Sequence, residues 1–391
     1  MRAIFVNPLA IALVFFAPCV SLPKQGDEFD VIVEVSEWKS EVWRGYPGHS
    51  DHERKTMTFS LDSGSIRYAI KYGYCADKSH APDVATPEGY IGMPEPRWEN
   101  WYGNGFLYII ANGKDIGLTK PSAIRKLEDG ERGSVQIVWD RSDIHVRLTF
   151  LIFPRDRALL AEVSVFARAE LKSLLVRLVA YPAAYTTQGE RCVVTPIRAI
   201  TQEKREEISP QNEWWLVYLD KKFDRAKGHT VGGCGAVFLP EEVASAKVSV
   251  ETYPIVTELE CKAGINRFHF AVFDFYDMTN AEAEEFMKAN ADRVAKLLRE
   301  TDFSCRHLRL EEWKKLKAVI HETLPYAKRN RKLYEAVSSL VGEIDKLYML
   351  MDELALKGQS APLELEDAII ANLEKLKSLV WELKFEKLFG D

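Results

Sequence analysis

The chain has 391 residues, of which 47% are hydrophobic and 28% are charged. This composition is typical of a folded globular protein and excludes a disordered, collagen-like or polytopic membrane protein. The 52 basic and 58 acidic side chains give a formal net charge of −6. Since the chain has no excess of basic residues for phosphate backbones, we expect no nucleic-acid partner.

The N-terminus has the pattern of a secretory signal peptide. Arg2 precedes an uncharged apolar run at residues 9–16, and small residues follow before the polar segment 24–27. The apolar run is too short to span a bilayer. We therefore expect cleavage of residues 1–21 and a secreted or periplasmic protein without a membrane span. Lipidation of Cys19 is an alternative that Pro18, directly before it, disfavours.

Export would expose the remaining cysteines to an oxidising compartment. Two interpretations stay open: Cys234 and Cys261 clip neighbouring strands together, or most of the cysteines are small buried apolar side chains. No two of them have the close spacing of zinc ligands, and we expect neither a metal nor a cofactor. The cysteines beyond the cleavage site are Cys75, Cys192, Cys234, Cys261 and Cys305.

Residues 29–276 show the alternation of antiparallel strands. Segments 55–61, 144–150 and 160–165 place apolar residues on one face, and Asn112-Gly113 between apolar runs indicates a hairpin. Roughly a dozen or more such segments exceed the usual size of one sheet, so two packed sheets are predicted. The chain has no repeated glycine-rich strand-to-helix unit, which argues against a parallel doubly wound sheet.

The periodicity becomes helical after residue 279. Thr279 and Glu282 have the spacing of a capping box, and a second helix ends at Pro325. Apolar residues then recur at alternating steps of four and three from Leu333 to Leu354, and a similar seam runs from Leu373 to Leu383.

We therefore predict an α+β fold: a large two-sheet antiparallel β-sandwich over 29–276, followed by a helical region over 279–391 with an antiparallel helical hairpin. The short connection between the two seams favours pairing within one chain. Dimerisation through the third helix, Leu333 to Leu354, is the alternative.

The most unusual segment is rich in aromatic residues, glycine and proline, and runs from Tyr90 to Tyr108. Aromatic faces can cover the C–H groups of a pyranose ring while amides and carboxylates bond its hydroxyls. The alternative is that these rings seal one end of the sandwich. The residues assigned to carbohydrate binding are Trp98, Trp101, Tyr102, Asn100 and, from an earlier aromatic segment, Trp43.

A polar loop at residues 46–54 holds His49 and His52, flanked by acidic residues. These imidazoles are candidates for acid–base chemistry, although a solvated turn is the simpler interpretation. Pro47-Gly48 favours a loop over the helix that would bring both imidazoles to one metal, so no metal ligand is assigned. The catalytic candidates are His49, His52, Glu95 and Glu99.

Other polar residues have ordinary structural interpretations. His145 and His269 alternate with apolar residues on predicted strands, where hydrogen-bonded structural histidines are expected. Asp274 and Asp277 precede the first helix and are interpreted as caps. The chain contains no Gly-x-Ser-x-Gly nucleophile elbow.

A long antiparallel sandwich with tryptophan-rich loops in an exported protein resembles the galactose-mutarotase-like supersandwich, here over about residues 29–276. The resemblance rests on architecture and implies saccharide binding in a concave sheet, with His and Glu or Asp as the catalytic groups of the family's enzymes. In related polysaccharide lyases a helical toroid precedes the sandwich, whereas the helices follow it here, which argues against a lyase.

We therefore predict a secreted carbohydrate-binding sandwich protein that also has the potential to process polysaccharide. If it is an enzyme, the expected class is a carbohydrate-active lyase, epimerase or hydrolase. The alternative is a structural or interaction protein of the cell envelope that docks through the C-terminal helices.

Overall fold

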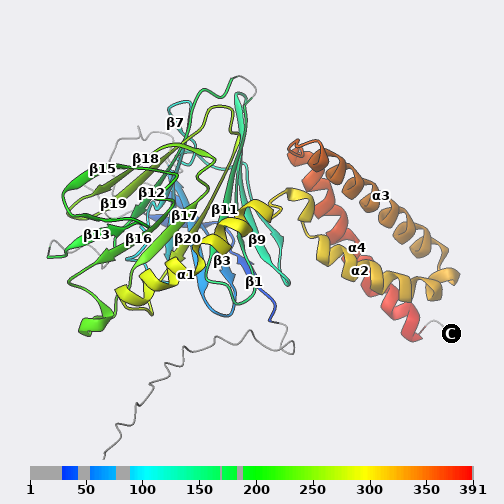
Figure 1. Ribbon diagram of the computed structural model, residues 1–391. Coiled ribbons are helices and arrows are strands. Elements are labelled where there is room, and N and C mark those ends of the chain that lie inside the picture. The colour runs from blue at the N-terminus through cyan, green and yellow to red at the C-terminus, as the bar shows by residue number, and fades with distance from the viewer. Residues whose placement is uncertain (1–28, 43–52, 76–88, 168–169, 183–187, 390–391) are drawn as a thin grey trace, which may run out of the picture.

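A computed structural model describes residues 29–42, 53–75, 89–167, 170–182 and 188–389. The predicted signal peptide, Trp43, His49 and His52 lie outside these ranges. Two antiparallel sheets pack face to face, and four α-helices follow them in the chain (Figure 1). The predicted α+β class and the two-sheet sandwich are therefore confirmed.

The larger sheet, called sheet 1, has eleven strands in the order β1-β3-β4-β5-β6-β12-β19-β18-β15, with β2 beside β3 and β7 beside β6. Its strands are β1 (Ile32–Val35), β2 (Lys39–Val42), β3 (Glu53–Asp62), β4 (Arg67–Cys75), β5 (Gly89–Glu95), β6 (Leu107–Ala111), β7 (Lys114–Asp115), β12 (Leu174–Ala180), β15 (Lys204–Ile208), β18 (Val243–Val250) and β19 (Ile255–Cys261).

The second sheet, called sheet 2, has nine strands in the order β14-β13-β16-β17-β20-β11-β10-β9-β8. Its strands are β8 (Ala123–Glu128), β9 (Gly133–Asp140), β10 (Ile144–Ile152), β11 (Leu159–Ala167), β13 (Arg191–Val194), β14 (Ala199–Thr201), β16 (Trp215–Asp220), β17 (Cys234–Phe238) and β20 (Arg267–Asp274).

The predicted hairpin at Asn112-Gly113 connects β6 to β7. Both residues have positive φ, 49° and 75°, as a two-residue type I′ connection requires. This tight turn matches the right-handed twist of the flanking strands, so the sequence signal identified the turn correctly.

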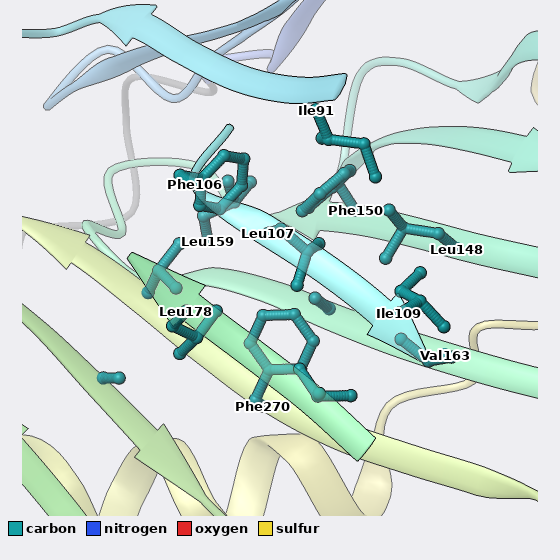
Figure 2. Close-up of a cluster of buried hydrophobic side chains, with 14 of the residues drawn as sticks. Ile91, Phe106, Leu107, Ile109, Leu148, Phe150, Leu159, Val163, Leu178 and Phe270 are labelled. Atoms are coloured by element: carbon teal, nitrogen blue, oxygen red, sulfur yellow. The ribbon is translucent and has the colours of Figure 1, made fainter. Parts of the chain in front are cut away.

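The main core lies between the sheets and consists of the inward-facing residues of each strand. Figure 2 shows Phe106, directly before β6, and Leu107 and Ile109 of β6 beside Phe150 and Phe270 of sheet 2. All five are buried. Burying one side chain of this size contributes about 1.5–3 kcal/mol, so the alternation that predicted the strands also accounts for their packing.

Cys192, Cys234, Cys261 and Cys305 are free thiols. Cys192, Cys234 and Cys261 are buried among apolar residues, so the predicted clip between Cys234 and Cys261 is absent. The interpretation of these three cysteines as small core side chains is confirmed.

The first helix, α1 (Asn280–Glu300), begins at the predicted capping box. The Thr279 side chain accepts a hydrogen bond from the Glu282 amide, and the Glu282 carboxylate accepts one from the Thr279 amide. The buried face of α1 includes Met287 and Val294 and covers Phe273 and Phe275 at the outer face of sheet 2. This helix therefore gives sheet 2 a second apolar layer.

The remaining helices form a bundle beside the sandwich (Figure 1). The 3-10 turn η2 (Cys305–His307) precedes α2 (Leu310–Thr323), η3 (Leu324–Arg329), α3 (Arg331–Leu356) and α4 (Leu363–Phe389). The predicted seams of α3 and α4 face one another, and their buried residues pack in one cluster. The helical hairpin is confirmed. Within the described residues, no helix is long and apolar enough to cross a membrane.

A buried charged cluster joins the bundle to sheet 2. Glu366, in the first turns of α4, forms ion pairs with Arg125 of β8 and Arg147 of β10, the latter at 2.7 Å. Arg125 also contacts Asp367 at 2.6 Å, and Arg147 donates to the Ala361 carbonyl at 2.7 Å. No local sequence pattern indicates these contacts, which hold α4 against the sheet.

Candidate functional site

Trp101 lies in the interior and not on the surface. Its side chain is 0% exposed, its indole N–H donates to the Phe273 carbonyl at 2.9 Å, and its ring packs edge-on to Tyr218. The expectation that this ring is available to a saccharide is therefore wrong. Trp101 instead closes the end of the sandwich, which was the alternative interpretation.

The reason is the backbone of residues 100–102, which continues sheet 1 between β5 and β12. The Tyr102 amide donates to the Val179 carbonyl at 3.2 Å, and the Tyr181 amide donates to the Asn100 carbonyl at 2.7 Å. Trp101 forms an isolated antiparallel bridge with Ala180 at the end of β12, and its indole is directed at the Phe273 carbonyl of sheet 2.

Asn100 is also fully buried and cannot contact a ligand at the surface. Its amide nitrogen donates to the Gly233 carbonyl at 3.0 Å and to Asp274 Oδ1 at 2.9 Å. The Tyr276 amide donates to the same Asp274 oxygen at 2.9 Å. The N-cap of α1 is Thr279, so the interpretation of Asp274 as a helix cap is wrong. Burial raises the pKa of Asp274 from its ordinary 3.8 to about 7.

This shift predicts a pH dependence of stability. Because the pKa of Asp274 is higher in the folded state, the folded protein binds the proton more strongly, and stability falls as pH rises from about 4 to 7. We expect Asp274→Asn to remove this loss. The free energy of unfolding of the variant minus that of wild type should therefore be about 2–4 kcal/mol larger at pH 8 than at pH 5. Urea unfolding of both proteins at these two pH values measures the difference. A difference that does not change with pH contradicts the prediction.

Glu95 and Glu99 lie on the surface, each beside an arginine. Glu95 is 3.4 Å from Arg67 and Glu99 is 3.1 Å from Arg97. The structure does not place either carboxylate against His49 or His52, because those histidines lie outside the described residues. A catalytic role for these four residues remains a prediction.

Trp98 and Tyr102 are the predicted residues that reach the surface. Trp98 is 38% exposed, and its ring lies against Gly103, where an added Cβ would be 2.5 Å from the ring. The Tyr102 ring centroid is 4.9 Å from that of Tyr181. Gly105 has a φ of +148° and lies against Tyr102 and the Tyr108 hydroxyl. Together, Trp98, Tyr102, Tyr108 and Tyr181 form the aromatic strip.

Tyr108 places its part of the aromatic strip on the outer face of sheet 1. Leu107 and Ile109 point into the core, so Tyr108 between them faces outward. The strand register puts Arg177 opposite Tyr108 and Glu258 opposite Arg177. Both α1 and the helical bundle pack against sheet 2 instead.

Polar groups accompany the strip. Arg177 Nη2 is 2.8 Å from Glu258 Oε1, and the Arg177 guanidinium lies 5.9 Å from the centre of the Tyr108 ring. Burial raises the pKa of Tyr108 and of Tyr181 to about 12. Their hydroxyls therefore keep their protons at neutral pH and can donate hydrogen bonds.

Asp115 is the carboxylate beside the aromatic strip whose pKa is raised toward the range of an acid–base group. It lies on β7, and its carboxylate accepts a hydrogen bond from the Gly117 amide at 2.9 Å. Burial raises the pKa of Asp115 from 3.8 to about 6, and its charge interacts with that of Arg177. The strip thus combines ring faces, hydroxyl donors, one cation and two carboxylates, Asp115 and Glu258.

Sequence reasoning missed Tyr181, Arg177, Glu258 and Asp115. Their positions depend on the pairing of β6 with β12 and of β12 with β19, which joins segments far apart in the chain. Alternation along β12 was the one available signal, since it predicts that Arg177 and Tyr181 share the polar face.

No family model and no curated protein matches the chain. Among solved structures, it is similar to a chondroitinase AC lyase in oligosaccharide complexes, with 10% identity over 60% of this chain, a TM-score of 0.37, and coverage of only 37% of the lyase. It is also similar to a putative aldose 1-epimerase from Klebsiella pneumoniae subsp. pneumoniae, with 8% identity, 68% and 88% coverage of the two chains, and a TM-score of 0.35.

A third similar structure is a TPR-domain containing protein from Parabacteroides distasonis, with 9% identity, 90% and 78% coverage, and a TM-score of 0.37. At TM-scores below 0.5 these similarities establish neither a family nor a ligand. The resemblance to galactose-mutarotase-like sandwiches stays a prediction.

Proposed function

We propose that this protein binds carbohydrate through the aromatic strip on the outer face of sheet 1. The observation that supports this most is the arrangement of Trp98 over Gly103 and of Tyr102 and Tyr108 around Gly105. Glycine at both positions lets the rings lie close to the backbone, and in this proposal the rings act together as one aromatic binding surface.

The chemistry of the strip favours a neutral saccharide. Aromatic faces cover the apolar C–H surface of a sugar ring, and few, well-placed polar groups fix its orientation. The Arg177 charge is compensated by Glu258 at 2.8 Å, and Asp115 adds a further carboxylate. An anionic sugar therefore finds no uncompensated cation among these groups.

Export forms part of the proposal. The signal-peptide pattern at residues 1–21 supports secretion or transport to the periplasm, where polysaccharides are encountered. N-terminal sequencing of the protein recovered from its natural compartment tests this, and an intact residue 1 would contradict it.

Two substitutions test the site. Trp98→Ala and Tyr181→Ala are each expected to weaken polysaccharide binding about five- to tenfold, because each removes one aromatic contact of about 1–1.5 kcal/mol. Affinity electrophoresis through gels containing neutral polysaccharides, followed by calorimetry with the retained polymer, measures the effect. Thermal unfolding checks that both variants remain folded.

Trp381→Ala is the matched control, because Trp381 is 66% exposed on α4, away from sheet 1. It is expected to bind like wild type. If no neutral polysaccharide retards the wild-type protein, or if Trp98→Ala and Tyr181→Ala are retarded as strongly as wild type, the proposed function is wrong.

The alternative is an interaction protein of the cell envelope that uses its helices. Trp381, Phe385 and Leu388 are spaced to lie on one face of α4 and are 66%, 61% and 72% exposed. A second copy of the chain is the partner to test first, by light scattering of the wild type and of Trp381→Glu. A monomeric wild type would count against this candidate.

A further inference from the structure

A cavity lies between sheet 2 and the loop that joins α3 to α4. It has a volume of about 460 Å³, and its lining includes Asp140, His145 and Ser360. His145 is on β10, Asp140 ends β9, and Ser360 comes from the connection after Gly358. Residues more than 200 positions apart thus meet in one cavity, on the sheet opposite the aromatic strip.

The three side chains form a hydrogen-bonded chain. Asp140 Oδ1 is 3.1 Å from His145 Nδ1, and His145 Nε2 is 3.0 Å from Ser360 Oγ. A carboxylate on Nδ1 holds the proton there and leaves Nε2 as the acceptor for the serine hydroxyl. This is the order of groups that activates a serine nucleophile.

Arg147 adds a positive charge beside the serine. Its Nε is 2.7 Å from Ser360 Oγ and 2.9 Å from His145 Nε2. When Nε–H donates to Oγ, the serine hydroxyl is left to donate to Nε2. The adjacent guanidinium then stabilises the negative charge that develops on Oγ when its proton leaves. Burial, and secondly the charge of Arg147, lower the pKa of His145, which favours the neutral imidazole that accepts a proton.

We infer that Ser360, His145 and Asp140 form a hydrolytic site for neutral short-chain carboxylic esters. Ser360 is the nucleophile, His145 the general base and then acid, and Asp140 a positioning residue. The cavity is lined by Phe166, Ala167 and Pro362, which suit a small acyl group, and by the Asp140 and Glu364 carboxylates, which disfavour an anionic acid.

The reaction uses water as its one co-reactant. Ser360 Oγ bonds to the ester carbonyl carbon while its proton moves to His145 Nε2. The carbon–oxygen bond to the alcohol then breaks, and Nε2 returns the proton to the leaving oxygen. Water attacks the acyl-serine, gives its proton to Nε2, and releases the acid as the serine is restored. The first amides of α4, at Leu363 and Glu364, have no acceptor within the helix and supply donors at the cavity wall for the oxyanion.

Covalent labelling tests the assignment directly on the full chain. Diisopropyl fluorophosphate is expected to modify Ser360 stoichiometrically, as located by peptide mass spectrometry, and p-nitrophenyl acetate and butyrate are expected to be turned over. Ser360→Ala should take no label, and its kcat should be at least about 100-fold lower than that of wild type. His145→Gln should lose turnover to a similar extent, and Asp140→Asn should lower kcat with little change in KM.

Ser339→Ala, at an exposed serine of α3, is the control and should label and turn over as wild type does. Thermal unfolding shows whether each variant is folded. If Ser360 merely links the bundle to the sheet, Ser360→Ala lowers the melting temperature while wild-type Ser360 takes no label. Absence of label at Ser360, or unchanged turnover in folded Ser360→Ala, overturns the inference.

Discussion

Replacing Trp101 with alanine is expected to lower the free energy of unfolding by about 3–5 kcal/mol. The indole is completely buried between the sheets and packs against Phe106 and Tyr218, with ring centroids 5.9 and 5.5 Å away. Alanine leaves a cavity that these fixed neighbours cannot fill. It also leaves the Phe273 carbonyl, which accepts the indole N–H at 2.9 Å, without this partner.

Trp98→Ala is the matched control for this prediction, since Trp98 lies three residues away and is 38% exposed. It should change the unfolding free energy by less than about 1 kcal/mol. Trp101→Phe keeps most of the buried ring and isolates the hydrogen bond, with an expected loss of about 1–3 kcal/mol. Denaturant unfolding followed by circular dichroism measures all three variants. Equal losses at positions 98 and 101 would show that Trp101 is not in the core.

The different positions of Trp98, at the surface, and Trp101, in the core, show what a local sequence pattern can predict and what it cannot. Period-two alternation was enough to predict the strands, and Thr279 with Glu282 was enough to place the start of α1. Both signals depend on residues close in sequence. The segment around Trp101 has glycines and two prolines that indicate a loop, whereas its backbone also bonds to Val179 and Tyr181 of a distant part of the chain.

The candidate sites were less predictable than the fold for the same reason. Tyr108 and Arg177 become neighbours only through the register of β6 on β12. His145 was expected to be a structural histidine, and nothing in its surroundings along the chain indicates Ser360, which α3 and α4 bring to it from 215 residues away. Alternation tells which face a side chain occupies, but strand order and helix docking decide what it meets there.

Replacing Glu366 with alanine is the other change expected to have a large effect, about 3–5 kcal/mol. The Glu366 carboxylate is 0% exposed, and its partners Arg125 and Arg147 are 8% and 4% exposed. Removing the Glu366 carboxylate leaves the buried guanidinium groups of Arg125 and Arg147 without the anion that they share. Arg125 keeps Asp367 and Arg147 keeps the Ala361 carbonyl, which limits the loss but does not replace the buried carboxylate.

Because this carboxylate joins α4 to sheet 2, the loss should appear first as separation of the helical bundle. Limited proteolysis is expected to cut Glu366→Ala within residues 301–309, between α1 and α2, faster than wild type. The control is Glu364→Ala, because Glu364 is exposed and lies two residues before Glu366 on α4. This substitution should change the free energy of unfolding by less than about 1 kcal/mol. Glu366→Leu combined with Arg125→Met removes one charge of each sign and should recover part of the loss, because the penalty arises from an unpaired buried charge and not from the missing pair itself. A Glu366→Ala protein as stable and as protease-resistant as Glu364→Ala would show that the cluster does not hold the two parts together.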